Sequence, residues 1–434
     1  MDMSPPRVAI IGAGAAGLAC ARECIKRGLS VRVLESHDQF GGTWSLSRSD
    51  SALYDGLRTN LPTVLMQFEG VPFRKELTKS FVTPKDMETY LLDFVSKFDL
   101  AKYVELETPV ERVSKSARSG DNSTCNWLVK TKVSTEEFDA VVVCNGHFNE
   151  PLVPEPLLSQ SHEWKGKAIH SKSYRRPQEF ANKVVVVVGG KSSGTDIAKE
   201  LDGIAKEVHV CDEGCPEEPY HKESTLEQVA DFDYMVPGTK CVHWRPRLAK
   251  LCPGSRVVEF AKDTPSLEAD VVIFCTGYQF AFEFLDDGLI EICENGKRLR
   301  PLHRELMHAE FPSLFFMGVN QPIVPFPFFE IQAKWVAHQI TSEPPCLQER
   351  MKDALSMDSF LASGVVTPSK AHVLPDQFQY LYNLATEANV DDLPALKTRL
   401  EKAKAIYQKV GMSRPTIPGA PDDYRDVIYE TSEG

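Results

Sequence analysis

Three glycines near the N-terminus have the spacing with which proteins hold a dinucleotide. In the segment "VAIIGAGAAGLACA" they are Gly12, Gly14 and Gly17. The first permits a tight turn after a strand, the second lets the backbone approach a pyrophosphate, and the third lets a helix pack closely on the strand. Glu35 follows at about the 20-residue distance at which an acid reaches ribose hydroxyls. These residues therefore predict a nucleotide cofactor, with its phosphates at a helix N-terminus.

A second glycine-rich turn, in "KVVVVVGGKSSGTDIAKEL", departs from this spacing at one position. Gly189 and Gly194 take the first and third glycine places, Ser192 and Ser193 complete the turn, and Lys191 stands at the middle place. Lysine puts a four-carbon stem where a pyrophosphate normally meets bare backbone. Two outcomes stay open: the ammonium pairs with a phosphate, or the stem crowds the nucleotide and weakens binding.

The acid that closes the second unit has its own consequence. The strand "KEVHVCD" ends at Asp212, at the same offset from its turn as Glu35 has from the first turn. A carboxylate there suits a ribose 2′-hydroxyl and repels a 2′-phosphate. Together, Lys191 and Asp212 therefore predict a second site that binds its dinucleotide more weakly and discriminates less between a nucleotide with a 2′-phosphate and one without it.

Each set of glycines requires a strand, a helix and a second strand to position it. The first unit is predicted as a strand over residues 8–11, a helix over 17–26 and a strand over 31–34, and five valines predict the strand that leads into the second turn. Two such units in 434 residues predict an α/β fold with two Rossmann-like dinucleotide-binding domains.

Composition limits the partners and the compartment. The net charge is -12 and no long Lys/Arg run occurs, so nucleic acid and anionic membranes are poor partners and small molecules are better ones. The 11 cysteines show no C-x-x-C pair or zinc spacing, which predicts reduced thiols in a cytoplasmic protein and no metal site. No apolar run approaches the roughly 20 residues of a membrane anchor. The oligomeric state is open between a monomer and a homodimer.

Further motifs follow the first turn along the chain. "GGTWS" contributes Gly42, Thr43 and Trp44, "LRTNLP" contains Asn60, and "EIQAKW" contains Gln332. Between them come "CNGH" at 144–147, "WKGKAIHSKSY" at 164–174 and "CTGY" at 275–278. In type and order these motifs resemble those of the flavin-containing monooxygenases, and the resemblance covers nearly the whole chain. Trp164 in place of the usual Phe is a mild departure from the family fingerprint.

The resemblance implies how the chain is divided and which residues lie at the cofactors. Residues 1–165 and 280–434 would form a discontinuous FAD-binding domain, and residues 166–279 an inserted NAD(P)H-binding domain. In this family the first glycine turn and the G-G-T-W segment hold FAD, the T-N-x-P asparagine faces the flavin, and a glutamine matching Gln332 approaches it. His170, in the fingerprint, is expected to be structural.

The same resemblance implies the reaction. NADPH reduces the flavin, the reduced flavin captures O₂ as a C4a-hydroperoxyflavin, and one oxygen atom passes to a soft nucleophile, an amine nitrogen or a thioether sulfur. Asn60 is the expected catalytic residue. Asp212 leaves NADH open as a second reductant, unless Lys172, Arg175 or Arg176 compensates for its charge.

Two other classes of protein stay open. A flavoprotein with an impaired nicotinamide site, acting as a binding or sensing module, would explain Lys191. A pyridine-nucleotide disulfide reductase shares the paired nucleotide folds, but it needs a redox cysteine pair beside the flavin, and the sequence has no C-x-x-C.

Overall fold

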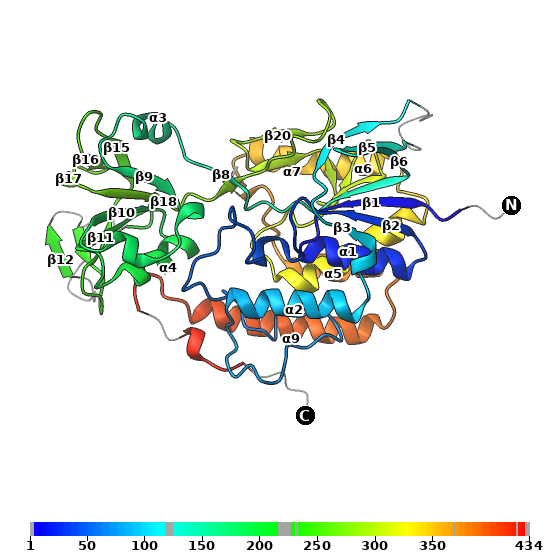
Figure 1. Ribbon diagram of the computed structural model, residues 1–434, viewed down its shortest axis with the longest axis horizontal. Helices are drawn as coiled ribbons and strands as arrows, with labels where there is room; N and C mark the ends of the chain where they lie inside the picture. The colour runs from blue at the N-terminus through cyan, green and yellow to red at the C-terminus, as the bar shows by residue number, and fades with distance from the viewer. Residues whose placement is uncertain are drawn as a thin grey trace.

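The computed structural model describes residues 4–117, 125–215, 227–230, 233–367, 370–421 and 424–429. Two lobes, each built on a mostly parallel seven-stranded sheet, lie side by side along the long axis of the molecule (Figure 1). The larger lobe contains both the N-terminal strand and the long C-terminal helices, and the smaller lobe is formed by the middle of the chain. The predicted α/β fold with two Rossmann-like units is confirmed.

The sheet of the larger lobe has parallel strands at its centre and two antiparallel strands at one edge. Val8, Ala9 and Ile10 of its central strand are fully buried, as expected for a strand covered on both faces. Across the sheet its strands are β22 (Leu302–His303), β23 (Met307–His308), β24 (Leu314–Phe316), β7 (Ala140–Val143), β1 (Arg7–Ile11), β2 (Ser30–Leu34) and β3 (Val104–Glu105).

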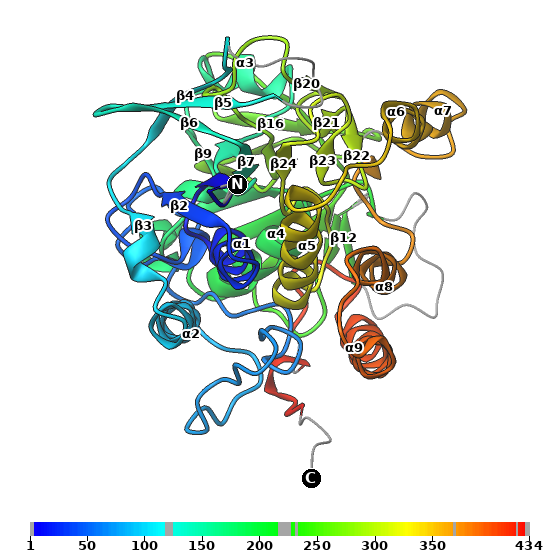
Figure 2. The same ribbon diagram turned by 90° about the vertical axis from the view of Figure 1, so that its right-hand side faces the viewer.

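Helices cover one face of this sheet and a small sheet covers the other. Among the helices, α1 and α5 pack against each other (Figure 2), and Pro325 begins α5, where a missing N–H costs nothing. The helices of this layer are α1 (Ala15–Lys26), α2 (Pro84–Lys97), α5 (Pro325–Ile340), α8 (Gln377–Glu387) and α9 (Leu393–Met412). The opposite face packs on an antiparallel sheet of β4 (Val110–Lys115), β5 (Trp127–Thr131) and β6 (Thr135–Phe138).

The sheet of the smaller lobe repeats this plan. Its five-valine strand is buried between parallel neighbours, with Val187 paired to Val210 on one side and to Ile273 on the other. Across the sheet the strands are β12 (Glu227–Ala230), β13 (Asp233–Met235), β14 (Val242–Arg245), β11 (Glu207–Cys211), β10 (Val184–Val188), β18 (Val271–Phe274) and β9 (Lys167–His170). The helix α4 (Ser192–Leu201) follows β10, as α1 follows β1.

The other face of the smaller sheet is covered by α3 (Leu157–Ser161) and by an antiparallel sheet of β15 (Leu248–Leu251), β16 (Val257–Phe260) and β17 (Leu267–Glu268). Leu157 and Trp164 belong to this hydrophobic cluster, although the predicted boundary assigns them to the FAD-binding domain. The boundaries at 165 and 280 stay a prediction, and the packing favours an earlier start for the inserted unit.

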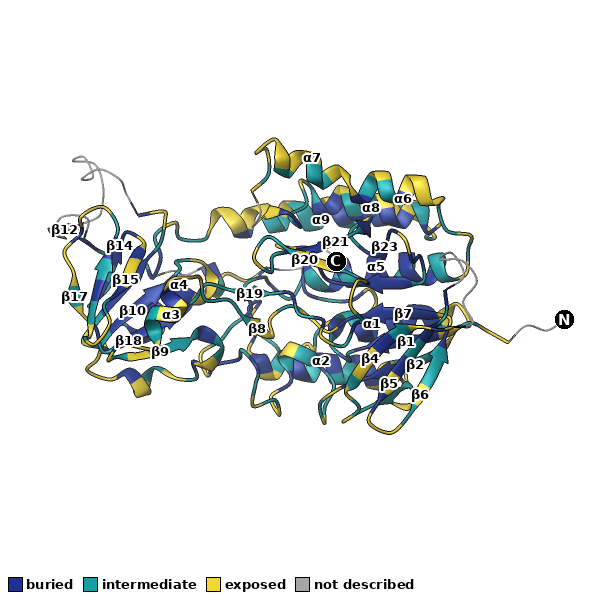
Figure 3. Ribbon diagram, turned by 90° about the horizontal axis from the view of Figure 1, so that it is seen from above, coloured by how far each residue is buried: buried dark blue, intermediate teal, exposed yellow. Residues whose placement is uncertain are grey.

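Two short strands connect the lobes. β8 (Glu150–Pro151) and β19 (Tyr278–Gln279) run antiparallel, so the outgoing and returning chain are hydrogen-bonded to each other. The central strands of both lobes are buried, whereas α6 (Leu347–Ala354) and α7 (Ser356–Ala362) present exposed faces (Figure 3). In the hairpin of β20 (Glu291–Cys293) and β21 (Arg298–Arg300), Glu291 and Ile292 are exposed, whereas Arg298 and Leu299 are buried. No helix in the described part of the chain combines the length and apolar character needed to cross a membrane. The predicted cytoplasmic location stays a prediction.

Candidate functional site

The first glycine turn joins β1 to α1 in a geometry that only glycine permits at two positions. Gly12 has φ 103°, and a Cβ there would lie 2.6 Å from the carbonyl oxygen of Cys144. A Cβ on Gly17 would lie 1.9 Å from the carbonyl oxygen of Gly12. Gly14 differs, because its φ of -76° suits any residue, and it caps the N-terminus of α1. The middle glycine therefore serves the approach of a ligand and is not required by the turn itself.

Glu35 closes the turn from the tip of β2. Its buried carboxylate accepts a hydrogen bond from the Ala13 backbone N–H at 2.7 Å and another from the His37 N–H at 3.0 Å. Oε1 is also contacted by the Ser36 hydroxyl at 3.3 Å and by His37 Nδ1 at 3.1 Å, whereas Oε2 accepts only from the Ala13 N–H among the described residues, so Oε2 is the oxygen with acceptor capacity left for a ribose hydroxyl. The acid is therefore already held at the turn where the sequence predicts it.

The G-G-T-W segment lies directly on the same turn. The Gly41 N–H donates to the Ala13 carbonyl at 3.0 Å, and a Cβ on Gly42 would lie 2.8 Å from the Gly14 Cα. Gly42, Thr43 and Trp44 form a 3₁₀ turn, in which Thr43 is exposed and Trp44 packs on the core. Two glycine segments thus make one cradle of close-packed backbone, which fits the pyrophosphate of a dinucleotide such as FAD.

The second glycine turn repeats the first in its backbone. Gly189 also has φ 103°, with a Cβ position 2.7 Å from the Cys275 carbonyl oxygen, and a Cβ on Gly194 would lie 1.8 Å from the Gly189 oxygen. Lys191 caps α4 with φ -82° and ψ -169°, close to the -76° and -177° of Gly14. Its side chain is exposed, as are those of Ser192 and Ser193. Lysine therefore fits the turn without backbone strain, and its exposure favours an outward stem.

Asp212 lies over the second turn. One carboxylate oxygen accepts hydrogen bonds from the Trp244 indole N–H at 3.0 Å and the Gly214 N–H at 2.9 Å. The other would lie 2.1 Å from a Cβ on Gly190, so the acid faces the turn as Glu35 does in the first unit. The negative charge is thus fixed where an adenosine ribose is expected.

The basic residues expected to offset Asp212 have other partners. Lys172 donates to the Asn149 carbonyl oxygen at 2.6 Å, Arg175 donates to main-chain carbonyl oxygens, and Arg176 pairs with Glu179 at 3.3 Å. These contacts hold the fingerprint segment at the lobe junction. They therefore do not support the expectation that one of these basic side chains offsets the negative charge of Asp212.

The C-terminal segment also reaches the second turn. After α9 it crosses to the smaller lobe near α4 (Figure 1), where a Cβ on Gly190 would lie 2.6 Å from the Pro418 Cγ. Ile417 and Ala420 pack on the hydrophobic cluster that contains Val210 and Val242. This contact could not be predicted from the sequence, because no motif links residues so far apart.

Two arginines of this C-terminal segment contact Asn60, the expected catalytic residue, one at its side chain and the other only at its main chain. Arg425 Nη2 donates to its side-chain Oδ1 at 2.5 Å, and Arg414 donates to its main-chain oxygen at 2.5 Å. Arg425 also forms a bidentate ion pair with Asp196 of α4, at 2.8 Å for each bond. Sequence reasoning missed Arg425 and Asp196. The signal that the sequence did contain was an acid, Asp196, two residues after Gly194 in the helix that follows the second turn.

Two histidines pin the chain where it crosses between the lobes. His147 Nδ1 donates to the Gly318 carbonyl at 2.9 Å, and His170 Nε2 donates to the Gly277 carbonyl at 3.0 Å. Burial lowers the pKa of each to about 4, so both are neutral near pH 7. His170 has the structural contacts expected of it, and neither ring is poised to act as an acid or base.

A small cavity of about 80 Å³ opens at this junction. Lys297 in its wall donates from Nζ to the Tyr278 carbonyl oxygen at 2.8 Å, and burial together with the charge of Lys191 lowers the pKa of Lys297. The lining is aromatic and amide-rich: His147, Phe148, Gly277, Tyr278, Gln279, Phe280, Lys297 and Gln321.

Gln332 is fully buried and has partners within the protein. Its Oε1 accepts from the Gly318 N–H at 3.2 Å, and its Nε2 lies 3.4 Å from Asn320 Oδ1 and 3.3 Å from the Tyr380 hydroxyl. Its predicted approach to a flavin stays a prediction, and its visible role is to order the loop after β24. Phe328, near it in the sequence, is buried core.

The buried cysteines do not form a redox pair. The sulfur atoms of Cys20 and Cys24 lie 3.9 Å apart inside α1, and a hydrogen bond with Cys144 together with burial raises the pKa of the Cys20 thiol. Every described cysteine is a free thiol. Deeply buried thiols of raised pKa are inert, which removes support for a disulfide reductase.

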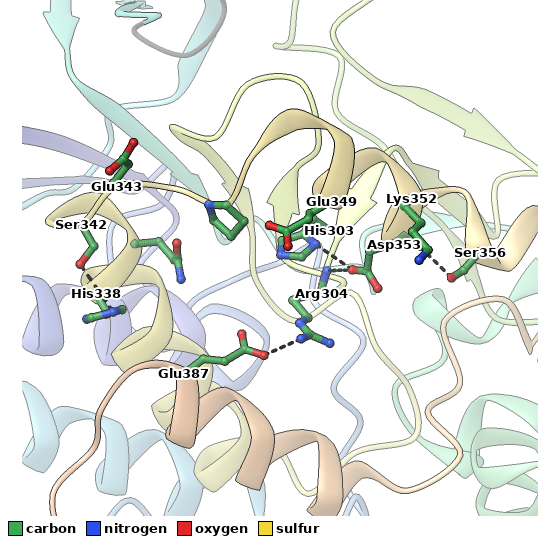
Figure 4. Close-up of a pocket in the computed structure, with 12 residues that line it drawn as sticks. His303, Arg304, His338, Ser342, Glu343, Glu349, Lys352, Asp353, Ser356 and Glu387 are labelled. Carbon is green, nitrogen blue, oxygen red and sulfur yellow. Dashed lines mark hydrogen bonds and ion pairs between the residues drawn. The ribbon is translucent and has the colours of Figure 1, made fainter.

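Two further features lie apart from the glycine turns. An open pocket of about 680 Å³ lies beside α5, α6 and α8, and its polar side chains contact one another, His303 with Asp353 at 2.9 Å and Arg304 with Glu387 at 2.6 Å (Figure 4). In the smaller lobe, ligand atoms of His209, Asp233 and His243 lie within 4.8 Å of one another. The expectation of no metal site overlooked this cluster because its members come from three strands. Arg245 pairs with Asp233, so the charge of the cluster is balanced by the protein itself.

Comparisons with known proteins identify the family of this chain. A family model described as flavin-binding monooxygenase-like matches residues 5–215 and 235–405. The flavin-containing monooxygenase FMO GS-OX-like 2 of Arabidopsis thaliana is 35% identical, over 96% of this chain and 90% of its own length. The solved S-allyl-L-cysteine S-oxygenase from Allium sativum is 31% identical with a TM-score of 0.82, over 98% of this chain and 96% of that one. Tmm from Pelagibacter sp. strain HTCC7211, at 23% identity and a TM-score of 0.70, shares the fold.

Proposed function

The chain belongs to the flavin-binding monooxygenase-like family, and from that membership we propose that it transfers one oxygen atom from O₂ to a thioether sulfur, with an amine nitrogen as the alternative acceptor. It is an oxidoreductase that acts on small molecules with O₂, and its cofactors are FAD and NADPH, as in the family. The balanced reaction consumes one substrate, O₂, NADPH and a proton, and yields the oxide, NADP⁺ and water.

The observation that carries the proposal is that both glycine turns open at one junction. Cys144, after β7, touches the first turn, and Cys275, after β18, touches the second. The chain that continues from each of these cysteines forms β8 and β19, which pair with each other. Cofactors held at the two turns would therefore extend toward the same crossing, as electron transfer between them requires.

The residues of this chain have distinct roles in that reaction. Gly12, Gly14 and Gly42 bring backbone to the FAD pyrophosphate, and Glu35 accepts from its ribose. Bound FAD supplies the redox chemistry and the activation of O₂. Asn60 would offer its amide NH₂ group as a hydrogen-bond donor to the flavin.

The second turn would hold the nicotinamide nucleotide. The N-terminus of α4, with Ser192 and Ser193, faces its phosphates, and the Lys191 ammonium adds a positive charge there. Asp212 favours the 2′-hydroxyl of NADH, so we propose reduced discrimination between NADPH and NADH relative to a site with a basic residue at this position.

We propose sulfur rather than nitrogen as the oxygen acceptor because of the name of one similar protein. The garlic protein with 31% identity is named for the S-oxygenation of S-allyl-L-cysteine, a thioether. A thioether sulfur is a soft nucleophile that needs no deprotonation, which agrees with the neutral, structurally engaged histidines at the junction.

Product analysis tests the proposal. Purified protein is incubated with NADPH under ¹⁸O₂ and a panel of thioethers and tertiary amines, and products are identified by mass spectrometry. We expect one ¹⁸O atom in a sulfoxide, and less or no amine oxide. Reactions under ¹⁶O₂, and reactions without NADPH, are the matched controls. Consumption of NADPH that yields only hydrogen peroxide with every compound would contradict oxygenation.

A further inference from the structure

A guanidinium at the end of the chain determines which way the Asn60 amide points. Arginine has only donors, so the amide must turn its oxygen toward Arg425, as the 2.5 Å contact between Nη2 and Oδ1 shows. The Asn60 NH₂ group must then point away from Arg425. Within the described ranges, that NH₂ group has no hydrogen-bond partner in the protein, so it is free to donate to a ligand.

The Arg425 side chain is itself fixed in place by an ion pair, so it can orient the Asn60 amide. The Asp196 carboxylate accepts a hydrogen bond of 2.8 Å from each of the two terminal nitrogens of Arg425. The Tyr54 hydroxyl donates to the same carboxylate at 3.3 Å. The two side chains of the ion pair are only 13% and 11% exposed. Bidentate pairs of this kind fix the plane of the guanidinium, and a largely buried pair resists screening by salt.

The Tyr424 ring adds a second constraint. The Arg425 guanidinium lies 5.1 Å from its centre, and the ring packs edge-on against Phe81 at 5.3 Å. The main chain is also held, because Arg58 donates to the Arg425 carbonyl at 2.8 Å. A segment that leaves the last helix is thus anchored on both sides of the arginine.

We propose that Arg425 is a positioning residue that orients the Asn60 amide so that its NH₂ group faces the flavin. This rests on the proposed function, in which Asn60 lies at the flavin. The ion pair with Asp196 also ties this orientation to α4, the helix that begins at the second turn. One guanidinium therefore joins the flavin side of the junction to the nucleotide side.

The test compares Arg425→Met with Arg414→Met. Arg414 belongs to the same segment and, of Asn60, contacts only the main-chain oxygen. Its guanidinium also lies 5.8 Å from the centre of the Tyr424 ring, and methionine keeps a packing contact with that ring, so Arg414→Met is the matched control. The fraction of NADPH electrons that ends as hydrogen peroxide is measured with a thioether present. We expect that fraction to rise about tenfold in Arg425→Met and to stay at the unmutated level in Arg414→Met.

Asn60→Asp keeps the inference testable if Arg425→Met fails to fold. An aspartate still accepts from Arg425, so the fold and FAD content are expected to persist, but the donor is lost and peroxide release should rise as in Arg425→Met. The double variant should release no more peroxide than either single variant, because both remove the same interaction. Lower FAD content or thermal stability with unchanged peroxide release would show that Arg425 is merely structural, and would overturn the proposal.

The visible spectrum of bound oxidised FAD gives a readout without turnover. We expect Arg425→Met and Asn60→Asp to change that spectrum in the same way, and Arg414→Met to leave it unchanged. If no oxygenated product forms even with the unmutated protein, the proposed function fails, while a shared spectral change would still support the positioning role. Spectra identical to that of the unmutated protein in both variants would overturn it.

Discussion

At the first turn a Cβ on the third glycine would lie 1.9 Å from a carbonyl oxygen, and at the second turn the corresponding distance is 1.8 Å. The first glycines both have φ 103° and both lie against the carbonyl that follows a neighbouring strand. The middle positions differ, Gly14 in one turn and Lys191 in the other, yet their backbone angles nearly coincide. The outer glycines are therefore required by the turn, and the middle one only by what approaches it.

The surroundings of the two turns differ more than the turns do. The first is covered by another glycine pair, Gly41 and Gly42, which leaves backbone on both sides of the space for a phosphate. The second is flanked by the Pro418 ring and by the Asp212 carboxylate. The two turns thus share one backbone geometry but differ in their surroundings, with close-packed glycine backbone over the first and a proline ring and a carboxylate beside the second.

The largest expected effect separates the outer glycine from the middle one within the first turn. Gly17→Ala should cost about 3 kcal/mol or more, because the methyl group meets rigid backbone, and little folded flavoprotein should be recovered. Gly14→Ala should fold normally, since its Cβ has no neighbour closer than 3.5 Å, and should lose FAD affinity instead. Thermal unfolding and flavin content measure the two effects. Equal destabilisation by both variants would contradict the division of roles.

Acid should weaken both lobes over the same pH range. His308 in the larger lobe and His209 in the smaller are buried, and burial lowers the pKa of each to about 4. Their unfolded forms bind protons below about pH 6.5, so stability is present above that pH and is lost as the pH falls toward 4.

The size of this loss can be measured at His308. Its Nε2 donates to the Leu289 carbonyl oxygen, and its Nδ1 accepts hydrogen bonds from the Glu310 and Phe311 N–H groups. A proton on Nδ1 would therefore replace two hydrogen bonds with contacts between donors. From pH 7 to 4.5, His308→Gln should lose about 2 kcal/mol less stability than the unmutated protein does. Urea denaturation at the two pH values measures it, with the exposed His162→Gln as the control. An identical loss in His308→Gln would refute the assignment.

A smaller effect concerns the acid of the second turn. Asp212→Asn keeps an acceptor for the Trp244 indole and removes the charge that repels a 2′-phosphate. The ratio of kcat/KM for NADPH over NADH should therefore rise about tenfold. An unchanged ratio would mean that the adenosine ribose does not lie at Asp212.

The smallest expected effect tests the lysine. If its stem points outward and its ammonium meets a phosphate, Lys191→Ala should raise the KM for NADPH about fivefold, and the difference should shrink at high salt. Tighter binding in Lys191→Gly would show instead that the stem crowds the nucleotide.

The sequence predicted the parts of the site that local geometry determines. The strands and helix around Gly12 begin one or two residues before their predicted bounds and end where predicted, and the five valines before Gly189 form a strand as predicted, because glycine spacing and apolar runs are properties of neighbouring residues. The placement of Glu35 and Asp212 over their turns followed from the same pattern.

The rest of the site depends on contacts between distant residues. Arg425 and Asn60 are 365 positions apart, and Pro418 reaches Gly190 from the last part of the chain. The His209, Asp233 and His243 cluster arises from the register of three strands. No spacing rule connects such residues, so tertiary structure was needed to find them.

The central claim is that one turn holds a flavin which the nucleotide at the other turn reduces. Mixing the purified protein with NADPH in a stopped-flow instrument without oxygen, and following the flavin absorbance, tests this directly. The account predicts about one FAD per chain and full bleaching by NADPH, with NADH slower or comparable. Colourless protein that takes up no FAD, or bound flavin that neither nucleotide bleaches, would contradict it.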